Sequence, residues 1–418
     1  MPKNQKKSWL IIILFLYLIF VNLILPLLSL LRVMRLSEPA AVRNIVLIIT
    51  IFALATTVGF FRVLRPYIWS QIILIFVFLQ AIFVGLAHLL QDGGLSAYFS
   101  HLFQIASFYI MLGIGWYAVD QISNNFWRHA SWLAMVGVGL ATALIIFLMV
   151  TVGVARFYTP AYQLLLPISF YTGNSLLGTL SALLLVLSSN KRSVLIASIF
   201  MLIMYFLFKK SIIYQTKFRP TKWLYSGLIF AAIMLGSSFY LTGSEKQSQF
   251  DELPVIRAIN ITLNRMIGFN SDAKNLDALN SYSSSRIEET QLALDSLQWY
   301  TWLVGNGAGW SINLGYVGAD IHNIHVTPIS LLMVYGAPFT IFIYTFLATL
   351  TLKLYLNRKK LRDNTTAKVG FLYLIGAVIH SFMAYSLFID LLIPFFVGTS
   401  LKILKNIKAK PLFLFHNR

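Results

Sequence analysis

The chain has 418 residues, of which 58% are hydrophobic and 11% are charged, and its formal net charge at pH 7 is +19. This composition, with a mean hydropathy of +0.75, exceeds what a soluble domain can cover with polar surface, so we expect a polytopic helical membrane protein. The basic residues lie in short runs between apolar segments, which is typical of membrane topology and not of a nucleic-acid partner. The absence of cysteine excludes disulfides, thiolate metal sites and cysteine nucleophiles.

The first half of the chain is a series of apolar runs. Lys3, Lys6 and Lys7 precede the first run and predict a cytoplasmic N-terminus. Eight runs near the roughly 20 residues that a bilayer requires follow. They are Trp9 to Leu31, Val42 to Phe61, Ile68 to Leu90, Tyr98 to Val119, Trp132 to Val154, Thr172 to Ser189, Val194 to Phe208 and Trp223 to Leu241.

Basic loops set the orientation of the later spans. The loops Lys209 to Lys222 and Lys353 to Lys368 are expected in the cytoplasm, which places the polar segment between them outside. This orientation requires an odd number of crossings before the segment, and the run Arg156 to Tyr171, with two prolines, is interpreted as a broken ninth crossing. The spans Val326 to Leu350, Val369 to Phe388 and Leu391 to Ile403 follow. The predicted fold is therefore all-α, with about 11–12 transmembrane helices and one large extracytoplasmic loop that is partly helical.

The polar segment 243–325 separates an N-terminal bundle, 1–242, from C-terminal helices and a basic tail, 326–418. It has nine of the 14 acids and a net charge of −4, whereas the rest of the chain carries +23. Within it, Ser284 to Trp302 is predicted to form an amphipathic helix on the membrane surface. Ile287, Leu294 and Leu297 share helical spacing, with Glu288, Glu289 and Asp295 on other faces. Glycines at Gly305, Gly307 and Gly309 end this helix.

Two histidines at the entrance of a span are candidates for acid–base chemistry. Neutral imidazole is a general base near physiological pH, so His322 or His325 is suited to deprotonating an acceptor hydroxyl. One alternative is a helix-entry capping cluster, Asp320 to Asn323, with exposed histidines. Another is a metal site formed by Asp320, His322 and His325, although no further clustered ligand is visible.

Basic side chains expected on the outer face are candidates for binding a diphosphate, because a guanidinium binds phosphate oxygens through two parallel hydrogen bonds. The alternative is pairing with acids of the loop or with lipid headgroups. The Gly305 to Gly309 run lacks the lysine and strand of a nucleotide loop, so we interpret it as a flexible turn. The diphosphate candidates are Arg286, Arg257, Arg265, Lys191 and Arg192.

The order of these motifs resembles the bacterial O-antigen polymerase (Wzy-type) and O-antigen ligase superfamily. The resemblance covers the architecture and the late loop: a helix led by Arg286, the Gly305-Asn306-Gly307 turn followed by Gly309, and the His322-Asn323 pair before a span with Gly336 at its midpoint. His322 keeps the dipeptide of the family, whereas His325 keeps its spacing to the glycine. Both are therefore candidates for the functional histidine.

The resemblance implies a glycosyltransferase of the bacterial inner membrane that acts on the extracytoplasmic face without metal or another cofactor. An undecaprenyl-diphosphate-linked oligosaccharide donates its reducing-end sugar to a hydroxyl of an acceptor glycan, and a chain-length regulator protein is an implied partner. We expect a polymerase of lipid-linked repeat units for a surface polysaccharide. The alternatives are a ligase that transfers glycan to lipid A core or to protein, and a flippase of the same lipid-linked glycan.

Overall fold

The computed structural model describes residues 3–20, 24, 39–59, 75, 77–86, 95–152, 162–172, 177–178, 181, 192–210, 286–314, 319–321, 324, 326–384 and 387–409. The regular secondary structure of these residues is helical apart from one small ribbon, so the all-α prediction is confirmed for them, with the ribbon as an addition. The labelled helices are α1 (Lys3–Ile19), α3 (Pro39–Val58), α6 (Leu95–Ala118), α7 (Asn124–Val152), α8 (Tyr162–Thr172), α10 (Arg192–Lys210), α15 (Arg286–Asp295), α16 (Thr301–Val304), α17 (Thr327–Tyr335), α18 (Ala337–Leu356), α19 (Thr365–Ser381) and α20 (Leu392–Ala409).

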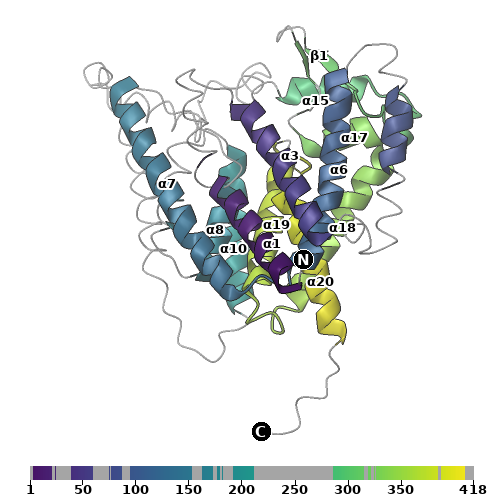
Figure 1. Ribbon diagram of the computed structural model, residues 1–418. Coiled ribbons are helices and arrows are strands. Elements are labelled where there is room, and N and C mark those ends of the chain that lie inside the picture. The colour runs from purple at the N-terminus through teal and green to yellow at the C-terminus, as the bar shows by residue number, and fades with distance from the viewer. Residues whose placement is uncertain are drawn as a thin grey trace. The chain divides into compact units, whose positions relative to one another are not determined.

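The ribbon consists of two three-residue strands between α16 and α17. Strand β1 (Ile312–Leu314) pairs antiparallel with β2 (Ala319–Ile321), and Ile312 lies opposite Ile321. Figure 1 shows β1 and α15 at one end of the α17 and α18 region, away from the end where α20 finishes. The ribbon therefore belongs to the polar end that carries the predicted site.

Most predicted spans within the described ranges form helices close to the expected positions. Two predictions were wrong because each expected single helix is interrupted. The expected span Val326 to Leu350 is two helices, α17 and α18, separated at Gly336, and the expected helix Ser284 to Trp302 is α15 and α16 with a turn between them. The span Trp223 to Leu241 lies outside the described residues, as do most of Thr172 to Ser189 and the first part of the run Arg156 to Tyr171, whose second part is α8 with Pro167 inside it.

Two helices in the described ranges are long and apolar enough to cross a membrane, Tyr98–Ala118 and Ala337–Leu356. Shorter apolar helices of 10–17 residues are Trp9–Ile19, Val46–Val58, Val77–Leu86 and Ile196–Phe208. A buried core helix of a soluble protein can have the same length and composition. The extent to which each helix is buried therefore shows how the two differ. The buried share of the apolar window is 61% in Tyr98–Ala118 and only 28% in Ala337–Leu356.

The chain divides into two compact units. Unit 1 contains Met1–Leu10, Ile51–Ile122 and Asp272–Arg418, and unit 2 contains Ile11–Thr50 and Ser123–Ser271. In unit 2, α8 packs against both α7 and α10, with Phe170 stacked on Tyr205 at 4.8 Å between ring centroids. The predicted loop 243–325 begins outside the described residues, and its described part from Arg286 onward belongs to unit 1.

The most extensive helix contact of unit 1 joins α6 to α20. Glycines permit this contact, because a Cβ added at Gly115 would overlap the Phe395 carbonyl and one at Gly398 would overlap the Leu112 carbonyl. The two helices run in the same direction, with Phe108 beside Phe388 near the start of the contact. At its other end Lys402 pairs with Asp120 at 3.8 Å.

Replacing Gly398 with alanine should destabilise unit 1, because the added methyl group meets backbone atoms of α6 that cannot rotate away. Overpacking of this kind costs about 1–3 kcal/mol. The measurement is the thermal unfolding midpoint of the purified protein in detergent. Gly139→Ala is the control, since Gly139 lies inside α7, where alanine favours the helix. Equal midpoints for the two variants would show that α6 and α20 are not in such close contact.

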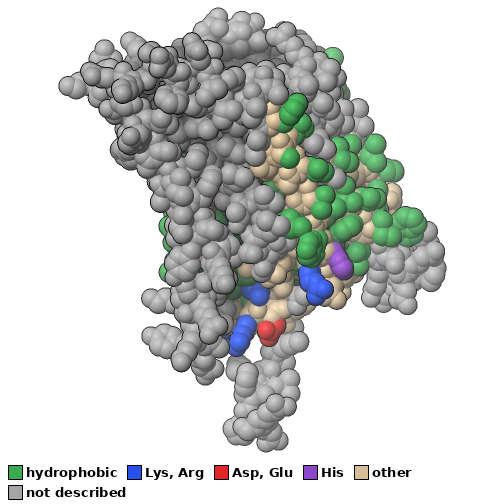
Figure 2. Space-filling view, turned by 90° about the vertical axis from the view of Figure 1, so that its left-hand side faces the viewer, with side chains coloured by type: hydrophobic (Ala, Val, Ile, Leu, Met, Phe, Trp, Pro, Cys, Tyr) green, Lys and Arg blue, Asp and Glu red, His purple; other side chains and the backbone are tan. Residues whose placement is uncertain are grey.

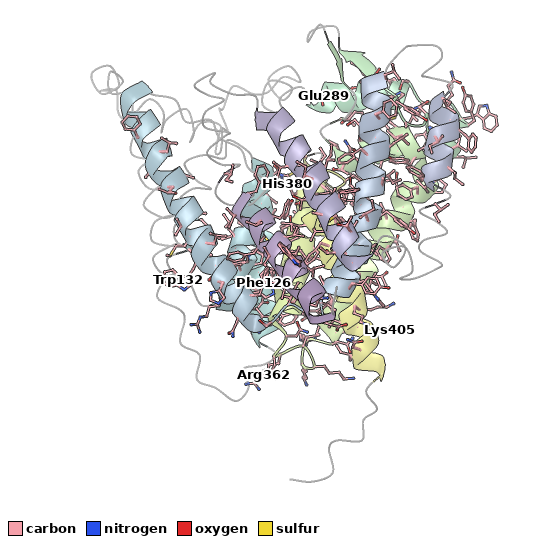
Figure 3. The ribbon with its side chains drawn as sticks, viewed as in Figure 1. Phe126, Trp132, Glu289, Arg362, His380 and Lys405 are labelled. Atoms are coloured by element: carbon pink, nitrogen blue, oxygen red, sulfur yellow. The ribbon has the colours of Figure 1, made fainter. Side chains whose placement is uncertain are left out.

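The two ends of unit 1 differ in charge. Arg362 and Lys405 lie at the end where α18 finishes and α19 begins, and Glu289 lies at the opposite end, as Figure 3 shows. The turn between α18 and α19 contains Arg358, Lys359, Lys360 and Arg362, and the Asn364 side chain caps α19 by accepting from the Ala367 N–H at 2.9 Å. Among the coloured side chains of Figure 2 hydrophobic ones predominate, and the Lys and Arg side chains lie in the lower part of the view.

Candidate functional site

The centre of the candidate site is the helix break at Gly336. Gly336 has φ 84° and ψ 168°, a conformation outside the helical region that is essentially restricted to glycine. Pro338 follows, and a proline has no N–H to donate to the carbonyl four residues earlier, that of Val334. The break therefore leaves carbonyl groups at the end of α17 without their helical donors.

The glycine run supplies those donors. The Asn306 N–H donates to the Met333 carbonyl at 2.7 Å, and the Gly307 N–H donates to the Val334 carbonyl at 2.9 Å. The Asn306 side-chain amide also donates to Met333, at 3.1 Å. The segment 305–307 thus replaces the missing turn of helix and holds α17 and α18 in their broken arrangement.

The interpretation of this run as a flexible turn was wrong. Gly305, Gly307 and Gly309 all have positive φ, at 71°, 83° and 90°, and Gly305 and Gly307 are buried. A Cβ at Gly305 would overlap the Val334 carbonyl. The glycines are needed because two backbone segments touch each other there, and a side chain would separate them.

The run also joins two further helices of unit 1. The Ala308 N–H donates to the Ala81 carbonyl at 3.2 Å in the helix Val77–Leu86, and the Gly309 N–H donates to His101 Nδ1 on α6 at 3.1 Å. His101 is buried, and Nδ1 carries no proton when it accepts this bond. The neutral ring then holds its proton on Nε2.

A small apolar core joins α15 to the chain that enters α17. Ala293 of α15, Trp310, Ile324 and Met333 are buried together, and Leu297, Ile312, Val326 and Ile329 pack against them. Ile324 lies between the two positions at which the sequence predicts catalytic histidines. The helix that Arg286 opens, the glycine run and the chain around Ile324 therefore meet in one place.

The structure locates only some of the predicted site residues. Arg286 is the first residue of α15 and Arg192 the first of α10, but their side chains lie outside the described part. Gly305, Gly307, Gly309 and Gly336 have positive φ as described above. The remaining candidates lie outside the described residues: His322, Asn323, His325, Arg257, Arg265 and Lys191.

Glu289 is a site residue that sequence reasoning placed incorrectly. The helical pattern put it on a face other than that of Ile287, Leu294 and Leu297, but only 3% of Glu289 is exposed. The buried face of α15 contains Glu289 and Ala293, four residues apart, whereas Leu292 is exposed. A buried carboxylate in a globular interior is ordinarily paired, and Glu289 does interact with another group of the protein. In the sequence, the small residue Ala293 was the feature that could have indicated which face of α15 is buried.

No group of three His, Cys, Asp or Glu side chains that can hold a metal ion occurs within the ranges that the structure describes. The alternative metal site of the sequence analysis involves His322 and His325, which lie outside those ranges. Asp320 is in β2, but its side chain is also not described.

No protein-family model matches the chain, and no curated protein matches it. The resemblance to the O-antigen polymerase and ligase superfamily therefore depends on the local motifs and their order. The contact between the glycine run and the Gly336 break links two of those motifs in space.

Substitution can show which of the two histidines acts as the general base. If the chain is the polymerase that the resemblance implies and a single imidazole removes the proton of the acceptor hydroxyl, then either His322→Ala or His325→Ala should reduce polymer formation by about 10²–10⁴-fold, the usual contribution of a general base, while the other variant remains active. The measurement is polymer length and amount at equal protein abundance. Full activity of both variants would contradict histidine base catalysis.

Proposed function

We propose that the chain is a polytopic protein of the bacterial inner membrane. The poorly buried helix Ala337–Leu356 supports this proposal, because its outward side chains, including Ile341, Leu352 and Leu356, are apolar. In unit 2, α7 carries an exposed apolar stripe at helical spacing: Trp132, Val136, Leu140 and Phe147. Exposed apolar surface of this extent is unfavourable in water and favourable against lipid.

The charge distribution of unit 1 supports an extracytoplasmic position for the site. α18 begins directly after Gly336, beside the glycine run, and ends next to the basic turn 357–364. The run also contacts the beginning of α6, whose other end carries Asp120 and its partner Lys402. The site and the basic residues thus lie at opposite ends of unit 1, and basic residues concentrate on the cytoplasmic side of membrane proteins.

Topology reporters test this orientation. A reporter fused at Asn280 should be active outside the cytoplasm, and reporters at Lys217 and Asn364 should be active inside it, because the basic loops remain in the cytoplasm. The measurement uses a paired reporter, alkaline phosphatase for the outside and a fluorescent protein for the inside. Cytoplasmic activity at Asn280 would contradict both the orientation and the position of the site.

We further propose that the protein polymerises undecaprenyl-diphosphate-linked repeat units into a surface polysaccharide. The observation that supports this function best is the convergence of α15, the glycine run and the chain around Ile324 on the break at Gly336. These segments carry the residues that the proposed chemistry requires. An arginine at the start of α15 and a histidine beside Ile324 would then face one substrate.

In the proposed reaction, the acceptor hydroxyl oxygen attacks the anomeric carbon of the donor's reducing-end sugar. A new glycosidic bond forms as the bond from that carbon to the diphosphate breaks, and the hydroxyl proton passes to His322 or His325. Undecaprenyl diphosphate leaves as an anion whose charge Arg286 stabilises through a pair of hydrogen bonds. This step needs no oxidant, nucleotide or metal.

A flippase is less well supported than a glycosyltransferase. A transporter is expected to carry ionisable groups at mid-span positions along its pathway, and Asp390 is the clearest acidic candidate. Its carboxylate accepts from the Tyr373 hydroxyl and, at 3.0 Å, from the Leu392 N–H that begins α20. This arrangement is that of a helix cap, so Asp390 has a structural role.

Analysis of glycan length in a deletion strain tests the function. If the protein is a polymerase, lipid A core capped with a single repeat unit should accumulate. A strain that lacks any capping would indicate the ligase, which uses the same donor and a different acceptor. Accumulation of lipid-linked repeats on the cytoplasmic leaflet would indicate the flippase and would overturn the proposal.

A further inference from the structure

A group of large apolar side chains is exposed between α15 and the glycine run. This tryptophan patch consists of Trp299, Tyr300, Trp302, Leu303 and Val304, with 80, 46, 44, 59 and 44% of each residue exposed. Large aromatic residues in a soluble protein contribute mainly to cores and interfaces. Five exposed large apolar residues within six positions, three of them aromatic, form a surface that water does not favour.

The orientation of the patch is set by a polar residue that points inward. Thr301 is buried, and its hydroxyl donates to the Gln298 carbonyl and accepts from the Gln298 N–H, both at 2.8 Å. The stretch is therefore inside out with respect to a soluble protein, with its threonine inside and its aromatic residues outside. Such an arrangement fits an apolar surrounding medium.

The patch is fixed at the end of unit 1 where the candidate span Tyr98–Ala118 begins. The Gln80 side-chain amide donates to the Val304 carbonyl, and the adjacent glycine run is bonded to Ala81 and to His101, as described above. Gln80 belongs to the helix Val77–Leu86, which exposes Leu79, Phe83 and Leu86 on one face. At the start of α6, Leu95 and Phe99 are also exposed. The patch thus continues the apolar surface of two helices.

We propose that the tryptophan patch lies in the interfacial region of the extracytoplasmic leaflet and anchors α15 and the glycine run to the bilayer. This inference rests on the proposed membrane location. Tryptophan and tyrosine concentrate at the membrane–water interface, where an apolar ring with a polar N–H or O–H fits both surroundings. Since the glycine run follows Val304 directly, the anchor holds the site at the level of lipid headgroups, where the diphosphate of a lipid-linked donor lies.

Single-cysteine labelling tests the anchor directly, because the chain has no cysteine of its own. Trp299→Cys and Leu303→Cys are labelled with a nitroxide in lipid nanodiscs, and collision rates with oxygen and with a water-soluble nickel chelate are measured. Asp295→Cys, an exposed position at the end of α15, is the aqueous control. Ile341→Cys, an exposed apolar position on α18, is the lipid control.

We expect the ratio of oxygen to nickel collisions at positions 299 and 303 to be several-fold higher than at position 295 and below that at 341, as for an interfacial position. Aqueous ratios at 299 and 303, with a lipid ratio at 341, would overturn the anchor and leave the membrane location intact. An aqueous ratio at 341 would overturn both. Exclusion of both reagents from 299 and 303 would show that protein covers the patch, which also contradicts a lipid contact.

Discussion

Replacing Arg286 with alanine should reduce polymer formation by about 10²–10³-fold, the loss typical of removing one preorganised group that stabilises transition-state charge. Arg286→Lys should retain a small part of the activity, because lysine keeps the charge and loses the two parallel hydrogen bonds to a diphosphate. The measurement is polymer synthesis from lipid-linked donor by the purified variants. The reason for the size of the effect is that the diphosphate gains negative charge as the sugar bond breaks.

The matched control is Arg362→Ala, since Arg362 is an exposed arginine in the basic turn between α18 and α19. Exposed arginines contribute about 0–1 kcal/mol through surface pairing, so Arg362→Ala should leave the rate unchanged at equal protein abundance. If Arg286→Ala were as active as this control, Arg286 would have a structural role only. The proposed mechanism would then lose its diphosphate ligand.

Gly336→Ala should prevent the accumulation of folded protein. A side chain at φ 84° and ψ 168° costs about 1–3 kcal/mol in backbone strain, and the new Cβ would overlap the Leu303 carbonyl, for which overpacking costs about another 1–3 kcal/mol. Together these costs are large compared with the marginal stability of most folded proteins. The measurement is the amount of protein that elutes as a monodisperse peak in detergent.

Gly307→Ala should have a similar effect, because its Cβ would overlap backbone atoms of Val84 and Gly85. Gly139→Ala again serves as the control and should fold normally. A flexible turn between α16 and β1 would tolerate alanine at position 307 with little change in yield. Normal yields of Gly336→Ala and Gly307→Ala would therefore contradict the close packing of the glycine run against the helix break.

Glu289 and His101 are buried, although their polar side chains would be expected at the surface. Glu289 lies on the inner face of α15, and His101 accepts a hydrogen bond from the glycine run. Both residues lie within unit 1, and His101 is bonded to a segment far from it in sequence. Their positions help to explain why a helix as short as α15 has a defined place beside α17.

The positions of the long helices were predictable from the sequence. The run Tyr98 to Val119 became α6 (Leu95–Ala118), and the run Val194 to Phe208 became α10 (Arg192–Lys210). These predictions succeed because helix length follows from a continuous stretch of apolar residues, which is a local property. The end of α16 at Gly305 was also predictable, since closely spaced glycines end a helix.

The break at Gly336, the conformation of the glycine run and the inner face of α15 were decided only by the tertiary structure. Hydropathy does not distinguish one apolar helix from two, so Val326 to Leu350 was interpreted as a single span although Gly336 and Pro338 mark the break. The donors to the freed carbonyls of Met333 and Val334 are Asn306 and Gly307, each 27 residues earlier in the chain than the carbonyl it bonds. Ala293, one helical turn after the buried Glu289, packs in a core with Trp310, Ile324 and Met333. Such contacts between distant segments depend on which backbones approach each other, and a local pattern does not contain that information.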